Sequence, residues 1–253
     1  DSDDPAIWVH PTNPEQSVVF ATLKDGGLVS FDLQGNILET YRPADFGDIR
    51  YNNVDLVYGF TGQNLAGEFE ADLAVLSDRA NDTLTILVIN PETGAITDVT
   101  SPDIPETIFG VDDGEATAYG LATYTSPVSG KSYAFVTQAD GNRVAQLELI
   151  PEIGPADEFF VNAEVVRILE LPVPTGDVTD SQSEGLVIDQ ELGLLYVSLE
   201  NEVGILRFSA EPNGGEYFTL VQSVEADYLV PDIEGLNIYY GPNGSGYLIA
   251  NSQ

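Results

Sequence analysis

The stretch Asp3-Asp4-Pro5-Ala6-Ile7-Trp8 decides the fold, because it is the first of five similar openings. In each opening, residues with side-chain oxygens stand directly before an apolar run. The other four are Asn52-Asn53-Val54-Asp55-Leu56, Tyr119-Gly120-Leu121, Glu184-Gly185-Leu186 and Asp232-Ile233-Glu234-Gly235-Leu236. They recur at intervals of roughly 50 to 65 residues, which is typical of a radial repeat with one supersecondary unit per period. The openings therefore predict β-propeller blades, each beginning with its innermost strand and directing its oxygens toward a central axis.

The sequence between the openings consists of short β-rich runs bounded by Gly, Pro, Asn or Asp, as strands and tight turns require. The runs cover residues 17–23, 27–33, 37–41, 73–77, 83–90, 133–137, 144–150, 165–171, 194–199, 203–208 and 218–224. About four strands fall in each period, which is the content of a propeller blade. Segments 102–114 and 172–181 are expected to be longer irregular loops. A β-sandwich is the competing all-β hypothesis, but it does not explain the recurring oxygens.

The composition excludes several classes of protein. With 42 acidic and 8 basic residues the formal charge is −34, which argues against binding to nucleic acid or to anionic membranes. A hydrophobic content of 43% is sufficient for a large core, so most of the acidic residues are expected on the solvated surface. The absence of cysteine excludes disulfides and thiolate chemistry. The sequence contains no run of about 18 apolar residues, so it predicts no membrane-spanning helix. The chain lacks an initial Met and its last residues look like an interrupted strand, so we expect a piece of a longer protein.

The oxygens of the openings predict a calcium site. Crowded carboxylates repel one another unless a cation lies among them, and calcium takes about six to eight oxygen ligands. The candidates are Asp3, Asp4, Asn52, Asn53, Asp55, Tyr119, Glu184, Asp232 and Glu234, with Glu200 at the end of a neighbouring strand run. For any one of them, a solvated loop residue is an equally good interpretation. The recurrence in all five openings favours the metal.

These segments resemble the motifs of the β-propeller phytases, a family of alkaline, calcium-dependent phytate hydrolases. The matching segments are Asp-Asp-Pro-Ala-Ile-Trp at 3–8, Asn-Asn-Val-Asp-Leu at 52–56, Tyr-Gly at 119–120, Ser-Gln-Ser-Glu-Gly at 181–185, Phe-Ser-Ala-Glu-Pro at 208–212 and Pro-Asp-Ile-Glu-Gly-Leu at 231–236. The resemblance extends over the whole chain. It implies a six-bladed β-propeller with several calcium ions in its funnel. The chain, as one incomplete domain over residues 1–253, would cover roughly the first four to five blades.

The resemblance also implies roles for individual residues. The catalytic calcium cluster would be bound or shaped by Asp3, Tyr119, Glu184, Glu200, Asp232 and Glu234, with Asp3, Tyr119, Glu184 and Glu234 as the catalytic residues. Asp4, with the backbone near Pro5 and Val54, would form a tighter structural calcium site, and Asp55 is a further expected ligand.

Lys24 and Arg79 match the phosphate-binding cations of the resembled family. Most lysines and arginines are solvated surface charges, but both of these follow strand runs at a turn, where they would reach the mouth of the funnel. Arginine suits bidentate contact with phosphate. The single histidine, His10, has no evident partner and is expected to be structural, and Trp8 is expected in the core between blades.

Three positions depart from the family pattern. Val57 stands where active relatives often carry an arginine, and Asp25 stands where a second lysine commonly follows the position of Lys24. A third lysine is expected near Ala139 and Asp140, where no cation occurs; Arg143 lies nearby but out of register. The calcium side of the site is therefore better preserved than the phosphate side.

The expected function is calcium-dependent release of phosphate from phytate, or its calcium complex, by attack of a calcium-bound water. We expect a secreted or periplasmic monomer, alone or beside a second propeller domain. Two alternatives remain open. One is a non-catalytic, calcium-stabilised accessory or binding domain, and the other is a calcium-dependent propeller esterase or lactonase.

Overall fold

The computed structural model describes residues 2–24, 26–43, 49–111, 115, 117–201, 203–225 and 228–252. Asp25, one of the three departures named above, lies outside these residues. The described chain is all-β, with eighteen strands and three short 3₁₀ helices at Pro14–Gln16, Val178–Ser181 and Pro242–Gly244. It divides into two compact units. Unit 1 contains residues 1–118 and 148–164, and unit 2 contains residues 119–147 and 165–253.

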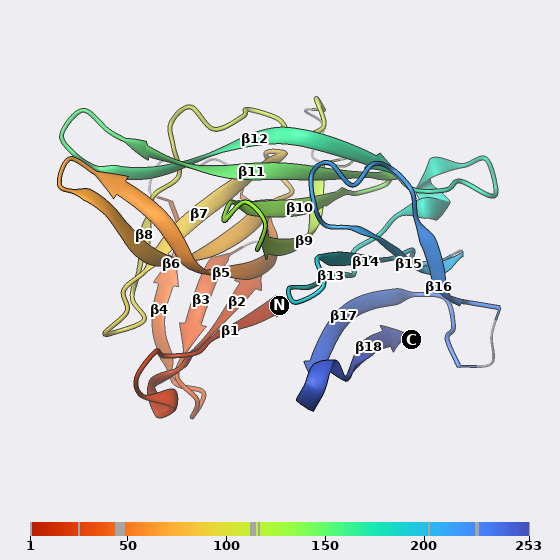
Figure 1. Cartoon of the computed structure of the whole chain (residues 1–253), viewed down its shortest axis with the longest axis horizontal. Helices are drawn as coiled ribbons and strands as arrows, with labels where there is room; N and C mark the ends of the chain where they lie inside the picture. The colour runs from red at the N-terminus through yellow and green to blue at the C-terminus, as the bar shows by residue number, and fades with distance from the viewer. Residues whose placement is uncertain are drawn as a thin grey trace. The chain divides into compact units, whose positions relative to one another are not determined.

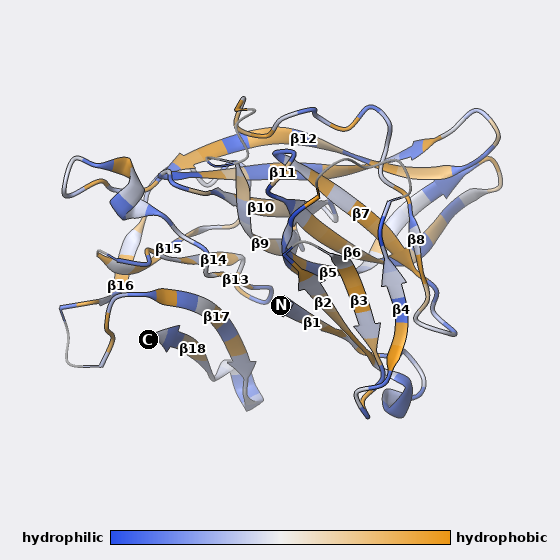
Figure 2. Cartoon of the chain, turned by 180° about the vertical axis from the view of Figure 1, so that it is seen from behind, coloured by the Kyte–Doolittle hydropathy of each residue, from blue (hydrophilic) through white to orange (hydrophobic). Residues whose placement is uncertain are grey.

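Unit 1 contains two antiparallel four-stranded sheets in which the strands follow one another in chain order (Figure 1). The first sheet consists of β1 (Ser2–Trp8), β2 (Val18–Leu23), β3 (Gly27–Phe31) and β4 (Ile37–Tyr41). The second consists of β5 (Tyr51–Asn64), β6 (Gly67–Asp78), β7 (Thr83–Ile89) and β8 (Ile96–Asp98). Buried apolar runs along β6 and β7, visible in Figure 2, account for the position of these two strands in the middle of their sheet.

The core of unit 1 lies between these sheets and includes Trp8, Phe20, Leu76 and Leu87. Trp8 is fully buried and donates its indole Nε1–H to Asp72 Oδ2 at 2.8 Å, so the prediction that it is a core residue is confirmed. His10 is also buried. Its Nδ1 accepts the backbone N–H groups of residues 12 and 13, an arrangement that orders the turn after β1.

Unit 2 contains most of a third sheet, of β9 (Ala118–Thr125), β10 (Ser132–Gln138), β11 (Arg143–Ile153) and β12 (Phe159–Glu170). The long strands β11 and β12 also contribute residues 148–164 to unit 1. A fourth sheet follows with β13 (Leu186–Asp189), β14 (Leu194–Ser198), β15 (Gly204–Ser209) and β16 (Thr219–Ser223). The strands β17 (Ile233–Tyr240) and β18 (Gly246–Ser252) form a two-stranded sheet.

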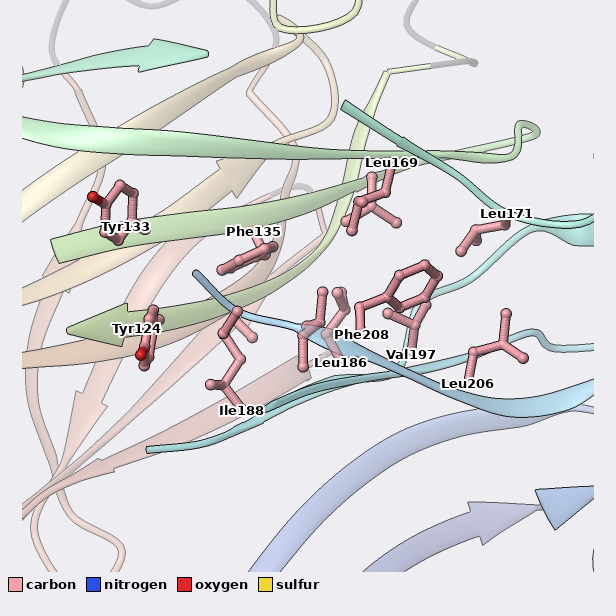
Figure 3. Close-up of a cluster of buried hydrophobic side chains, with 14 of the residues drawn as sticks. Tyr124, Tyr133, Phe135, Leu169, Leu171, Leu186, Ile188, Val197, Leu206 and Phe208 are labelled. Carbon is pink, nitrogen blue, oxygen red and sulfur yellow. The ribbon is translucent and has the colours of Figure 1, made fainter. Parts of the chain in front are cut away.

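The largest core of unit 2 packs the third sheet against the fourth (Figure 3). Phe135 and Tyr124 from the third sheet face Leu186, Val197 and Phe208 from the fourth, and all are almost inaccessible to solvent. A smaller cluster around Ile205 and Ile233 packs the fourth sheet against β17 and β18. Aromatic and branched side chains on facing sheets supply the buried apolar area that holds such layers together.

Each of the five openings lies on, or directly before, the first strand of a sheet: β1, β5, β9, β13 and β17. Every β-rich run expected from the sequence overlaps a strand. The all-β class is therefore confirmed, and each of the first four openings begins a four-stranded sheet, whereas the fifth begins a two-stranded one. The number of six blades stays a prediction. The sequence analysis missed the long extensions of β5, β6 and β12, where Phe159 contacts both Phe60 and Phe69.

Candidate metal and phosphate site

Four of the predicted ligands lie near one another in unit 2: Glu184, Glu200, Asp232 and Glu234. The backbone N–H groups of Asp232 and Ile233 donate to the carbonyl oxygen of Glu200, which joins the end of β14 to the start of β17. Burial, with smaller contributions from the negative charges of the other three carboxylates, raises the pKa of the Glu200 carboxyl to about 7. Glu200 Oε1 is buried and has no hydrogen-bond partner in the structure.

Gln182 positions Glu200, a role that sequence reasoning did not assign to it. Its Nε2 donates to Glu200 Oε2 at 2.8 Å, and its Oε1 accepts the backbone N–H of Asp140 at 2.7 Å. The backbone N–H of Glu200 returns a bond to the carbonyl oxygen of Gln182. Gln182 thus links the turn between β10 and β11 to the end of β14. The predicted ligand Tyr119 has a comparable contact, since its hydroxyl donates to Glu184 Oε2 at 2.8 Å.

Glycines let the first strands of successive sheets approach closely in unit 2. A Cβ atom on Gly120 would collide with the carbonyl oxygen of Glu184. A Cβ on Gly185 would collide with the carbonyl oxygen of Glu234 and with Ser198 Oγ. At Tyr119-Gly120 and Glu184-Gly185, the pattern of an oxygen-bearing residue followed by glycine therefore has a packing reason, because the glycine lets the next strand approach.

In unit 1, the predicted ligand Asp3 and the predicted phosphate-binding Lys24 form an ion pair. Lys24 Nζ lies 3.2 Å from Asp3 Oδ1, with side chains 48% and 14% exposed respectively. The antiparallel pairing of Ser2 with Leu23 places the two residues at the same end of β1 and β2. Asp3 Oδ2 is buried and has no hydrogen-bond partner in the structure.

Asp4 connects the first strands of the two sheets in unit 1. Its Oδ2 accepts the backbone N–H of Val54 at 3.0 Å, which brings the predicted structural site near Asp4 and Val54 into one place. Thr22 strengthens this connection, because its hydroxyl accepts the Asp4 N–H and donates to the carbonyl oxygen of Asn52. Asp55 is half-buried on β5, and its Oδ1 accepts the N–H of Leu56.

Arg79 stands directly after β6 in a turn that several backbone contacts fix. Its N–H donates to the carbonyl oxygen of Arg50, and its own carbonyl accepts the hydroxyl of Thr117. Buried Asp82 holds the following loop by accepting the N–H groups of Phe109 and Ala118. The backbone that carries the Arg79 guanidinium is therefore hydrogen-bonded through both its N–H and its carbonyl oxygen.

A buried hydroxyl recurs at the end of the second strand of each four-stranded sheet. Asn53 N–H donates to Ser77 and Gly120 N–H donates to Thr137, while Ser198 donates to the carbonyls of residues 185 and 233. With Thr22, these residues make the set Thr22, Ser77, Thr137 and Ser198. The residues two positions further along are Lys24, Arg79, Ala139 and Glu200. The three predicted site residues of this set thus occupy equivalent places, and the hydroxyl two residues before each is a signal that the sequence carried.

Val57 and Ala139, two of the residues at the departures from the family pattern, lie in the core, whereas Asp140 is exposed. Val57 is 2% exposed on β5, opposite Leu73 on β6. Ala139 is fully buried, at the place in the third sheet that Lys24 and Arg79 occupy in the first and second sheets. Neither position presents a side chain to solvent. Arg143 donates its Nε–H to Gln138 Oε1 at 2.8 Å.

The donors in both units are oxygens, which are the ligands that calcium prefers. The buried oxygens Asp3 Oδ2 and Glu200 Oε1 lack hydrogen-bond partners, and a bound cation would supply the missing interaction. Over the described ranges, no three His, Cys, Asp or Glu side chains already converge on one metal position. The donors thus fit calcium in their chemistry, but the side chains of the described donors are not arranged around one metal position.

The sequence model of one protein family, described as Phytase, matches residues 1–253. The chain belongs to the phytase family. A member of that family, the 3-phytase of Bacillus subtilis, is 39% identical over 254 residues. The match covers 100% of this chain and 59% of that phytase, so the chain spans well under two thirds of its relative. The resemblance inferred from the motifs is confirmed.

Solved structures with a similar fold belong to more distant proteins. A putative 6-phosphogluconolactonase from Bacteroides uniformis has a TM-score of 0.54 at 19% identity, over 97% of this chain and 63% of that one. A periplasmic gluconolactonase from Pseudomonas aeruginosa has a TM-score of 0.50 at 14% identity, over 90% and 58%. At these identities the likeness concerns the fold alone, which is propeller-like. Among the described residues of this phytase-family chain, no helix is long and apolar enough to cross a membrane.

Proposed function

We propose that the protein containing this chain releases phosphate from phytate in a calcium-dependent reaction. The observation that carries the proposal is the match to the phytase family over the whole chain. The nearness of Glu184, Asp232 and Glu234 to the buried Glu200 supports the calcium dependence, because a bound cation would offset the repulsion among these carboxylates.

Different residues of the chain would bind the cation and the anion. Asp3, Glu184, Glu200, Asp232 and Glu234 would hold calcium, with Asp4 and Asp55 at a further site. When bound, calcium supplies positive charge for the phosphate oxygens and a water able to attack phosphorus. The Tyr119 hydroxyl orients the Glu184 carboxylate through its hydrogen bond. Lys24 and Arg79 would bind phosphate groups, Arg79 through its planar guanidinium.

This arrangement answers an electrostatic difficulty. Phytate carries many negative charges, and a chain with a formal charge of −34 repels it. Lys24 and Arg79 alone do not reverse that field. Carboxylates that bind cations would make the local potential positive at the place where the phosphate must bind. Because the attacking water would be supplied with the cation, no Ser, Cys or His nucleophile is required.

The test is phosphate release from phytate by the complete protein, in calcium and in chelator, together with Glu184→Gln and Arg79→Ala. We expect calcium-dependent release that falls at least about 100-fold in Glu184→Gln, as for loss of one preorganised charge-stabilising group. A smaller loss, mainly in KM, is expected for Arg79→Ala. Arg207→Ala changes a cation on β15 outside the proposed site and serves as the control. Release that persists unchanged in chelator would contradict the proposal.

A non-catalytic, calcium-stabilised accessory domain is the second candidate. It is favoured by the buried Val57 and Ala139, which leave two positions of the phosphate side without a cation. Calcium binding without turnover of phytate would support it.

A calcium-dependent lactonase or esterase is the third candidate, favoured by the fold shared with the putative 6-phosphogluconolactonase and the gluconolactonase. Such an enzyme does not need Lys24 and Arg79. Hydrolysis of a lactone that survives Arg79→Ala would therefore support it over the phytase proposal. For all three candidates we propose export from the cell and a monomeric state.

A further inference from the structure

The ion pair between Asp3 and Lys24 joins two residues with opposite proposed tasks. Asp3 is proposed to hold a cation, whereas Lys24 is proposed to bind an anionic phosphate. In the structure they neutralise each other, with 3.2 Å between Lys24 Nζ and Asp3 Oδ1. An ammonium that is paired with a carboxylate attracts phosphate less strongly than a free one, because the two charges largely cancel at a distance.

The pair is asymmetric in its surroundings. The Asp3 side chain is 14% exposed and its Oδ2 is buried without a partner, so the carboxylate is fixed and only partly satisfied. The Lys24 side chain is 48% exposed, and its flexible stem follows the end of β2. An ion pair with one largely exposed partner is weak. A divalent cation carries twice the charge of an ammonium and can use both oxygens of a carboxylate. Asp3 is therefore a better partner for a divalent cation than for Lys24.

We propose that the Lys24 ammonium pairs with Asp3 only in the absence of a divalent cation, and that it leaves the Asp3 carboxylate when the cation binds there. The released ammonium is then free to bind a phosphate group. The inference rests on the proposed function for the identity of the cation and anion. It makes the anion-binding side of the site dependent on the cation-binding side, so that occupation of Asp3 by the cation strengthens phosphate binding through Lys24. By linkage, phosphate bound at Lys24 strengthens cation binding by the same factor.

The composition of the chain makes the exchange measurable, because Lys24 and Lys131 are its only lysines. Lys131 is exposed, lies in unit 2 and serves as the internal control. We suggest limited acetylation of the protein in chelator and in calcium, with the two lysines resolved by peptide mass spectrometry. Reductive ¹³C-methylation provides a second readout, since it gives one dimethyl-lysine NMR signal from each. Calorimetry on the same samples reports calcium binding independently.

In the wild type we expect calcium to raise the acetylation rate of Lys24 relative to Lys131 by about two- to fivefold, the range for loss of an exposed ion pair. The Lys24 NMR signal should move at the same calcium concentrations at which calorimetry detects binding. In Asp3→Asn, Lys24 should react at the faster rate already in chelator. Asp103→Asn, the same change at an exposed position of unit 1, should behave as the wild type does.

The outcomes separate the inference from the proposed function. Calcium binding by calorimetry with an unchanged Lys24 overturns the exchange and leaves the calcium proposal intact. Absence of calcium binding overturns both. An Asp3→Asn variant in which Lys24 still reacts slowly in chelator also overturns the exchange, because another group must then hold the ammonium.

Discussion

Among single residues, Glu200 has the environment least suited to an ionised side chain. It is 7% exposed, one of its oxygens has no partner, and burial together with three nearby carboxylates raises its pKa to about 7. A raised pKa means that the folded state favours the protonated form. The stability that this form contributes is complete below the ordinary value of 4.5 and is lost as the pH rises to about 7.

Glu200→Gln should therefore stabilise the protein in chelator. At pH 8 we expect the free energy of unfolding to rise by about 1–3 kcal/mol, the cost of a buried polar group without a partner. The gain should shrink as the pH falls from about 7 through 4.5, because below 4.5 Glu200 is neutral in both states. Denaturant unfolding at several pH values measures it. Glu191→Gln, at an exposed turn position, is the control and should show no such trend. If Glu200→Gln lowers the free energy of unfolding at pH 8 in chelator, the ionised carboxylate is not unfavourable in the folded state.

Gln182 is a second single residue with a specific role, because it orients the Glu200 carboxylate. Gln182→Ala removes the bonds to Glu200 Oε2 and to the N–H of Asp140. We expect calcium affinity, measured by calorimetry, to fall about tenfold, as for loss of a group that orients a metal ligand. Gln190→Ala also removes side-chain bonds in unit 2, to residues 123 and 125, and should leave the affinity unchanged. Equal losses in both variants would mean that Gln182 has only a general structural role.

At the scale of strands, glycines set how closely one sheet approaches the next. A Cβ on Gly185 meets the carbonyl of Glu234, whereas a Cβ on Gly235, at the same place in the next opening, lies 3.7 Å from Asn251 Cβ. We expect Gly185→Ala to lower the free energy of unfolding by about 1–3 kcal/mol or more, the range for overpacking. Gly235→Ala should change it little, because its methyl group finds ordinary van der Waals space. Thermal unfolding distinguishes the two, and equal effects would contradict the packing argument.

At the scale of the whole chain, the acidic excess makes stability depend on cations. Each carboxylate cluster is proposed to bind calcium only in the folded state, so calcium should raise the unfolding midpoint as its concentration rises. At 100 times the dissociation constant the gain is about 2.7 kcal/mol for one site. Scanning calorimetry with calcium and with EDTA tests this, with magnesium as the control cation. An unchanged midpoint in EDTA would remove calcium from the proposal.

The amino-acid sequence by itself determined most of the strands, the grouping of the first four periods into four-stranded units, and the five openings. These follow from local alternation, turn residues and recurrence, which need no knowledge of distant contacts. It also indicated the oxygen-rich residues and, through its motifs, the family.

Only the tertiary structure decided how these residues pair. The ion pair of Asp3 with Lys24, the burial of Glu200 and Val57, and the bond from Gln182 to Glu200 all depend on strands packing side by side. The extensions of β5 and β6 likewise make aromatic contacts with Phe159, which lies 99 residues after Phe60 and 90 after Phe69. Long-range packing, which no local pattern encodes, sets the dielectric environment and the partners of each charged group. The chemistry of the site is therefore fixed at that level.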